Sequence, residues 1–254
     1  KTQAYIFDDV AAYQASTIVF PVGKTIHLKD RGADFEVIDG TGTATGNGTI
    51  SNSNTSQSAV LVQKSTNTID MYGAANGVNS SAAINEAIAL HTGYLGASSS
   101  GYMLDAQLDF ISGPCTGLKG QGEIDTVFNK AFNGDAIINN NQGATFSDFW
   151  ITGDSANYAG GGMYMVADDS HIERVRITDT TDAPIILQGK TGGVNVKGAT
   201  SNTVDDCFLQ AASDGYAIRS DGVDLSPSPT ARVFSRIRGG AAMVNFAGMN
   251  RAVL

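Results

Sequence analysis

Two aspartates, Asp182 and Asp214, each stand just before a strand-like segment. Asp182 lies in "TTDAP" ahead of "PIILQG", and Asp214 lies in "ASDGY" ahead of "YAIRSDG". If these segments are neighbouring strands with Ile186 opposite Ile218, the two carboxylates lie about 5 Å apart, which suits the nucleophile and acid/base of a retaining glycosidase. Close carboxylates also raise the pKa of one partner, as a general acid requires. The alternative is that both are turn residues, because aspartate is common in turns for its own hydrogen-bonding reasons.

Four segments further suggest stacked side chains, because they share one pattern. Each has an apolar residue, two others, an apolar residue, one other, and then a small or apolar residue. Their starts are 26, 32 and 30 residues apart, and the segments are "FSDFWITG" from Phe146, "IERVRITD" from Ile172, "VDDCFLQA" from Val204 and "FSRIRGG" from Phe234.

Stacking would place equivalent residues about 4.8 Å apart and would create columns of side chains. One outward column alternates aromatic ring and cation: Trp150, Arg176, Phe208 and Arg238. Cation–π contacts explain such a column structurally. It also suits glycan binding, because rings cover the C–H faces of pyranoses while guanidinium groups bond hydroxyls or carboxylates. Both interpretations stay open.

The adjacent outward column alternates in charge, and the columns beside it are apolar. Ion pairs between neighbouring strands contribute about 0.2–1 kcal/mol each and fix the register. The charged column is Asp148, Arg174, Asp206 and Arg236, and the inward columns are Phe149, Val175 and Cys207, then Ile151, Ile177 and Leu209.

The elements that must position these columns are short strands in a repeat. Each of the four segments is followed, 9 to 17 residues later, by a second strand-like segment. A period of roughly 20–35 residues with several strands per repeat predicts a parallel β-solenoid. A short helix over residues 80–91, capped by Asn79 or Ser80, is expected to cover the open first turn with its apolar face, because a terminal repeat cannot bury its own core.

The chain ahead of this helix predicts a small β element. Strands are expected at 4–7, 17–20, 24–28, 35–38 and 59–63, with one or two helical turns over 8–16. Residues 41–58 hold almost no large apolar side chains, so a loop or thin edge ribbon outside the core is expected there. The predicted organisation is residues 1–68 as this element, 69–104 as a loop and capping helix, and 105–254 as an all-β parallel β-helix.

Composition narrows the function. The 254 residues are 42% hydrophobic but only 16% charged, with 30 glycines, which is typical of a turn-rich β protein. Net charge is −9 without a basic tract, so nucleic acid is not an expected partner. No apolar run is long enough for a membrane span, and the three histidines are not gathered with carboxylates, so we expect no membrane insertion, metal or cofactor. The two cysteines are expected to be free, buried hydrophobes.

Several segments carry a family resemblance. "IDMYGAANGVNSSAAINEAIA" resembles the loop and Ser/Thr-capped helix that close the first turn in the pectate-lyase-like right-handed parallel β-helix superfamily. "GLKGQGEIDTVF" at 117–128 is similar to an early turn of such proteins, and "YIFDDVAAYQASTIVFPVGKTIHL" is similar to the β element that precedes the helix in many bacteriophage tailspikes. In this chain Asn76, Asn79 and serines replace the acidic residues common in that loop.

The resemblance implies a tailspike or tail fibre subunit of the virion. Such a protein would form a homotrimer, contact other phage tail proteins and attach to host surface polysaccharide, a capsule or an O-antigen, with depolymerase activity as a common addition. The chain is expected to be incomplete at its C-terminus. The alternatives are a stand-alone polysaccharide lyase or hydrolase, which would call for a secretion signal and calcium ligands, and a purely structural virion stem.

Overall fold

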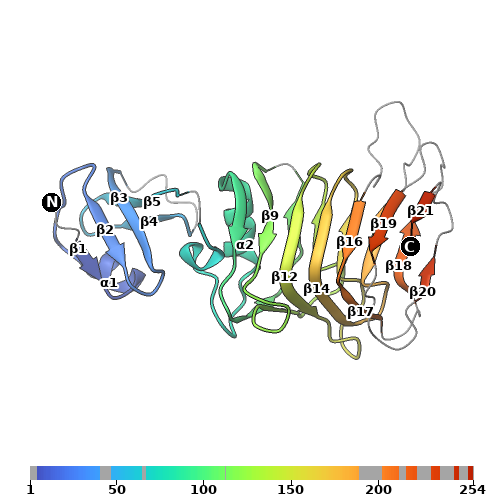
Figure 1. The fold of residues 1–254 in the computed structure, drawn as a ribbon. Helices are drawn as coiled ribbons and strands as arrows, with labels where there is room; N and C mark the ends of the chain where they lie inside the picture. The colour runs from blue at the N-terminus through green and yellow to red at the C-terminus, as the bar shows by residue number, and fades with distance from the viewer. Residues whose placement is uncertain are drawn as a thin grey trace.

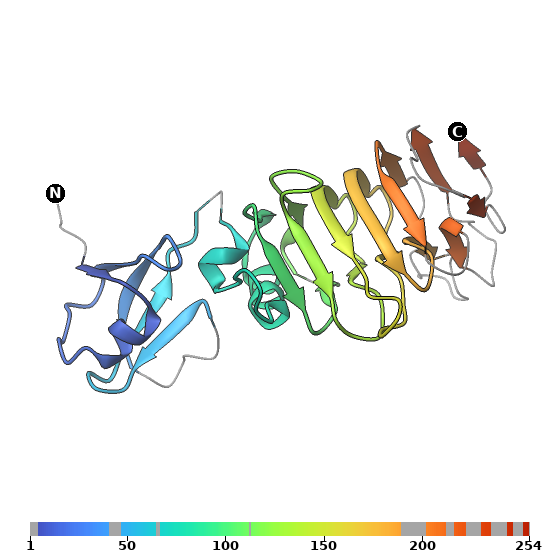
Figure 2. The ribbon, with the colours of Figure 1, turned by 90° about the horizontal axis from the view of Figure 1, so that it is seen from below.

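The chain forms a small N-terminal sheet followed by a long stack of parallel strands (Figure 1). The computed structural model describes residues 5–40, 47–64, 67–111, 113–188, 202–211, 216–221, 230–234, 243–245 and 251–253. The strand nearest the N-terminus and the strand nearest the C-terminus lie at opposite ends of an elongated molecule (Figures 1 and 2).

The N-terminal element is a five-stranded sheet in the order β1-β2-β3-β5-β4, and only the β1–β2 pair is parallel. Its strands are β1 (Tyr5–Phe7), β2 (Thr25–Leu28), β3 (Ala33–Asp39), β4 (Thr49–Asn52) and β5 (Gln57–Leu61). The expected short helix is α1 (Val10–Ala15). Asp9 caps its N-terminus, where the Asp9 carboxylate accepts a hydrogen bond from the Ala12 N–H. The expected edge ribbon is β4, but the expectation that it lies outside the core is wrong, because Ile50 packs in the core and Asn52 is fully buried. Residues 41–46 lie outside the described part.

The strand predicted at 17–20 is wrong. Ile18 and Val19 are 53% and 69% exposed, and only Phe20 enters the core. The backbone of Phe20 bonds to the Gln57 side-chain amide, with its N–H donating to Oε1 at 3.0 Å and its carbonyl accepting from Nε2 at 2.7 Å. Because a side chain satisfies this backbone, the segment has no need of a neighbouring strand.

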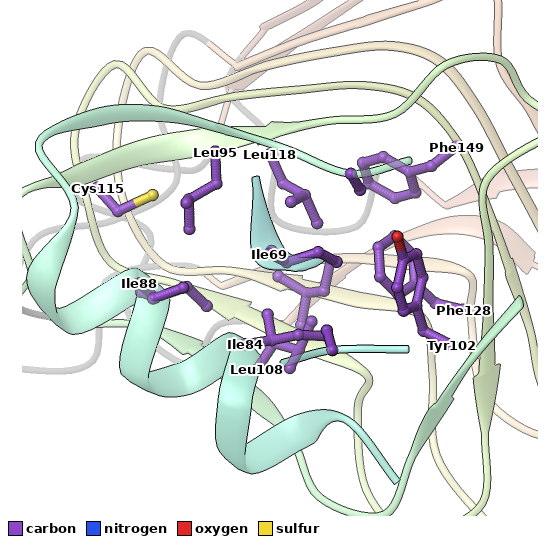
Figure 3. Close-up of a cluster of buried hydrophobic side chains, with 14 of the residues drawn as sticks. Ile69, Ile84, Ile88, Leu95, Tyr102, Leu108, Cys115, Leu118, Phe128 and Phe149 are labelled. Atoms are coloured by element: carbon purple, nitrogen blue, oxygen red, sulfur yellow. The ribbon is translucent and has the colours of Figure 1, made fainter. Parts of the chain in front are cut away.

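The helix predicted over 80–91 is α2 (Ser81–Leu90), preceded by the single turn η1 (Ile69–Tyr72). Ala83, Ile84, Ala87 and Ile88 are buried. Ile84 and Ile88 face the first strands of the solenoid (Figure 3). The predicted side-chain cap is wrong in detail. Ser80 is the residue at the N-cap, but its hydroxyl donates to the Val78 carbonyl and accepts from the Ala75 N–H, so it holds the preceding loop instead of the helix.

The solenoid contains one bent sheet with two arms and a separate third sheet, and every pairing within them is parallel. The first arm consists of β6 (Gly93–Gly96), β9 (Cys115–Lys119), the first halves of β12 (Thr145–Thr152) and β14 (His171–Thr180), β16 (Asn202–Asp205), β19 (Thr230–Phe234) and β21 (Arg251–Val253). The second arm consists of β7 (Gly101–Leu104), β10 (Val127–Lys130), the second halves of β12 and β14, and β17 (Phe208–Ala211).

The third sheet closes each turn of the solenoid. Its strands are β8 (Leu108–Phe110), β11 (Ile137–Asn139), β13 (Met163–Met165), β15 (Ile185–Gln188), β18 (Tyr216–Asp221) and β20 (Met243–Asn245). The core runs along the inside of the three faces, where Phe128 packs against Tyr102 and Phe149 at ring-centroid distances of 5.4 and 5.5 Å (Figure 3). The predicted parallel β-solenoid is therefore confirmed.

The predicted register holds for three of the four segments. Phe146 pairs with Ile172, and Ile172 pairs with Val204. Farther along the chain Val204 pairs with Val233, so the alignment that began the fourth segment at Phe234 is wrong by one residue. Val233 and Phe234 are adjacent and both apolar. The alternation of apolar and polar residues therefore could not decide which of the two faces the core.

The two arms meet at a corner, which we call the αL corner, formed by Asp148, Arg174 and Asp206. These residues have φ of 63°, 49° and 45°, in the left-handed region. The sequence pattern explains the bend at this corner. Phe146 and Phe149 both point inward although they are three residues apart, whereas in a flat strand every second residue points inward. A bend between them restores the alternation. Left-handed backbone costs a non-glycine residue about 1–2 kcal/mol, which the contacts of these side chains must offset.

Candidate functional site

A groove follows the outside of the αL corner, and it consists of two adjoining cavities that share Asp148 and Arg174. The first has a volume of about 660 Å³ and the second of about 460 Å³. The first is lined by Asn67, Thr68, Tyr94, Leu95, Gly96, Lys119, Gly120 and Gln121, and the second by Gly122, Glu123, Arg176, Asp206, Cys207 and Phe208. We call this the corner groove.

A bidentate ion pair joins two turns of the solenoid in the middle of the groove. Arg174 donates from Nε to Asp148 Oδ1 at 2.6 Å and from Nη2 to Oδ2 at 3.1 Å, and its Nη1 pairs with Glu173. Burial alone would raise the pKa of Asp148. The hydrogen bonds from Arg174 and Ser147, together with the positive charges of Arg174 and Lys119, outweigh burial and hold this pKa below its usual value. The same ion pair raises the pKa of Arg174, and the negative charge of Asp206 adds to this increase. Three members of the predicted charge column, Asp148, Arg174 and Asp206, therefore lie along one flank.

The predicted aromatic–cation column is also assembled. Trp150 pairs with Arg176, and Arg176 pairs with Phe208, on successive strands. The Arg176 guanidinium carbon lies 4.5 Å from the Trp150 ring centroid and 4.6 Å from that of Phe208, so a ring covers each face of the cation. The Trp150 indole N–H donates to Thr178 Oγ1 at 2.9 Å. Arg238 lies outside the described residues, as does Arg236.

These contacts bear on both interpretations of the column. Arg176 covers the faces of the Trp150 and Phe208 rings that point toward it, which gives the column a structural role between turns. Arg176 and Phe208 nevertheless line the second cavity, so they also present polar and apolar surface to the groove.

Sequence reasoning did not place Glu123 in this groove. Glu123 lies in a short loop between Gly120 and Thr126. The Gly120 N–H donates to the Ser147 carbonyl, and the Thr126 carbonyl accepts from the Trp150 N–H. No strand period extends through this loop, so the repeat gave no signal for the position of Glu123. The structure brings it to the same cavity as Asp206 and Arg176.

Asp182 lies at another corner, between β14 and β15, and does not line either cavity of the groove. Its carboxylate forms an ion pair with Arg219, whose Nη2 donates to Oδ2 at 2.9 Å. The register assumed for pairing it with Asp214 is wrong, because Ile185, and not Ile186, lies opposite Ile218. Asp214 lies outside the described residues, so the Asp182–Asp214 pair stays a prediction.

A different carboxylate, Asp135, lies near Asp182. Burial raises the pKa of Asp135, and the negative charge of Asp182 adds to this, whereas a hydrogen bond from the Gly161 N–H at 2.7 Å opposes it. The sequence gave no sign of this neighbour, because it comes from an earlier turn of the solenoid.

The described ranges hold no candidate for two other kinds of site. No cluster of three or more His, Cys, Asp or Glu side chains has the arrangement of a metal site there. None of the described helices has the length and apolar character needed to span a bilayer.

Comparison with known proteins identifies the fold. No family model matches the sequence, and no curated protein matches it. Among solved structures, the enzymatically active domain of tailspike protein 2 from bacteriophage CBA120 aligns with 92% of this chain at a TM-score of 0.61 and 12% identity. The fold is that of β-helical phage tailspikes.

A second tailspike supports this result. A tailspike protein of the Acinetobacter baumannii bacteriophage Fri1, described as a capsular polysaccharide depolymerase, aligns with 92% of this chain at a TM-score of 0.56 and 11% identity. The aligned region spans 37% of the CBA120 tailspike chain and 59% of the Fri1 tailspike chain. The tailspike resemblance of the sequence is thus confirmed at the level of fold.

Proposed function

We propose that this chain is part of a bacteriophage tailspike that attaches the virion to host surface polysaccharide through the corner groove. The observation that carries the proposal is the groove itself, which extends across several turns of a tailspike-like solenoid. A long shallow groove suits an extended polymer better than a small metabolite, and its walls combine ring faces, cations and carboxylates.

The lining matches the chemistry of sugars. Tyr94, which is 51% exposed, and Phe208 offer apolar surface for pyranose C–H faces. Lys119 and Gln121 donate hydrogen bonds, while Glu123 and Asp206 accept them from sugar hydroxyls. The proposed assembly is a homotrimer in the virion tail, joined to other tail proteins.

Binding is tested by incubating the purified protein with a panel of capsular and O-antigen polysaccharides and measuring retention by biolayer interferometry. We expect saturable binding to one glycan, which Trp150→Ala and Phe208→Ala weaken while circular dichroism shows that both variants remain folded. Leu90→Ala, which removes an exposed side chain that lines neither cavity of the groove, is the control. Absence of binding to every glycan would favour the alternative of a structural stem.

Depolymerase activity has two candidate locations. In the groove, Arg174 holds Asp148 ionised, so Glu123 and Asp206 are the carboxylates left for acid and base roles. At the other corner, Asp182 and Asp214 are the predicted pair. New reducing ends or unsaturated sugars would show cleavage. Their loss in Glu123→Gln and Asp206→Asn would assign the groove, whereas loss only in Asp182→Asn and Asp214→Asn would assign the other corner and favour a glycosidase mechanism.

A further inference from the structure

Arg176 differs from the other arginines whose side chains the structure describes. Arg31, Arg174 and Arg219 each donate to a backbone carbonyl or a carboxylate. No hydrogen bond or ion pair joins Arg176 to any described residue, and its Nε is buried without a partner there. A buried donor without a partner costs about 1–3 kcal/mol, more when it is charged, so this arrangement calls for an explanation.

The two rings define how Arg176 can bind a ligand. Trp150 and Phe208 cover its faces at 4.5 and 4.6 Å, so the guanidinium plane is fixed and water has access only to its edge. Arg176 lines the second cavity of the corner groove, so the N–H donors of its edge other than the buried Nε are available to a groove ligand. A fixed planar fork of N–H donors matches a carboxylate, which it binds through two parallel hydrogen bonds.

The carboxylates of the cavity do not fill this role. Arg174 is engaged by Asp148 and Glu173, whereas Glu123 and Asp206 line the cavity without an ion pair to Arg176. Among the described residues, no carboxylate is therefore paired with Arg176, and a carboxylate of a bound ligand can take that position.

We propose that Arg176 is a carboxylate subsite, so that the polysaccharide bound in the corner groove contains uronic or other carboxylated sugars. This inference rests on the proposed function and specifies its substrate class. The ring sandwich keeps the guanidinium pre-organised, so the carboxylate binds without ordering a long flexible side chain.

The probe is D-glucuronate, and the reporter is Trp150, the single tryptophan of the chain, which lies against Arg176. Indole fluorescence is followed during titration with glucuronate, glucose and inorganic phosphate at constant ionic strength. We expect a saturable change with glucuronate, none with glucose, and a weaker response to phosphate, whose tetrahedral oxygens match the planar fork less well.

Variants separate charge from geometry. Arg176→Gln should abolish the glucuronate response, and Arg176→Lys should weaken it by about 10-fold because a point charge replaces the planar fork. Lys64→Gln, which removes a cation from the N-terminal element, should respond as wild type. Circular dichroism verifies folding of each variant.

The inference is overturned if glucuronate produces no saturable change, if glucose or phosphate produces an equal one, or if Arg176→Gln responds as wild type. If the protein retains a neutral polysaccharide and its Trp150 fluorescence does not respond to glucuronate, the attachment function stands and only the carboxylate subsite is refuted.

Discussion

Substituting Gly120 by alanine should disrupt the contact between two turns of the solenoid at the αL corner. A Cβ at this position would lie 2.1 Å from the Asp148 carbonyl oxygen and 2.9 Å from Thr126 Cβ. Ordinary contact begins at about 3.4 Å, so the carbonyl must withdraw by about 1.3 Å, the difference between 3.4 and 2.1 Å. The obstacle is backbone, which cannot rotate away as the end of a side chain can.

The size of the effect follows from what that movement breaks. The Gly120 N–H donates to Ser147 at 2.9 Å and the Gly122 N–H donates to Asp148 at 3.0 Å, and both bonds lie across the displaced contact. Two lost hydrogen bonds at about 0.5–1.5 kcal/mol each, with about 1–3 kcal/mol of overpacking, give a loss of roughly 2–6 kcal/mol. For a chain of this size, each kcal/mol lowers the melting temperature by about 2–4 °C.

The assay is thermal unfolding followed by circular dichroism, with urea unfolding for the free energy. Gly101→Ala is the matched control, because a Cβ there meets only the side chains of Asn76 and Asn129, at 3.2 and 3.6 Å. We expect a change within about 1 kcal/mol for the control. Equal melting temperatures for the two variants would refute the stacking of turns at this corner.

Three further predictions concern the groove, the core and the capping helix. Because Asp148 has a depressed pKa in the folded protein, its ionised form stabilises the fold at pH values above the ordinary value of 3.8, and this stability is lost as the pH falls through the depressed pKa. The difference in melting temperature between wild type and Asp148→Asn should therefore be largest near pH 7 and shrink below about pH 4; a difference that grows on acidification would contradict the ion pair. Burial raises the pKa of the Cys207 thiol to about 12, so neither Cys207 nor Cys115 should react with a thiol reagent at pH 8 until the protein unfolds; rapid labelling of the native protein would show that the inward columns are misplaced. Ile84→Ala should cost about 2–5 kcal/mol because it empties a buried site beneath α2, whereas Leu90→Ala on the exposed face should cost under about 1 kcal/mol; urea unfolding measures both, and equal costs would contradict the capping role.

The sequence predicted the fold well where residue type and spacing agreed. The apolar face of α2 and the alignment of Phe146 with Ile172 and Val204 followed from periodicity alone. The column of Trp150, Arg176 and Phe208 followed from that alignment.

Register was missed where two apolar residues are adjacent. Val233 and Phe234 are equally apolar, as are Ile185 and Ile186, so the pattern could not decide which of each pair faces its partner. The three-residue step between the inward residues Phe146 and Phe149 indicates a bend at Asp148. The predicted columns did not include this bend, because they assumed a flat strand.

Two features of the candidate sites depend on contacts that no period describes. Glu123 reaches the groove on an excursion between turns, and Asp135 reaches Asp182 from an earlier turn. Such positions follow from the three-dimensional path of the chain, which residue spacing does not encode.

A crystal structure of the protein with an oligosaccharide cut from the polysaccharide that it retains would test the central claim most directly. We expect sugar rings along the αL corner between Lys119 and Phe208, in contact with the Arg174 and Arg176 side chains. Sugar density confined to another face of the solenoid, with the corner groove filled by solvent, would contradict it.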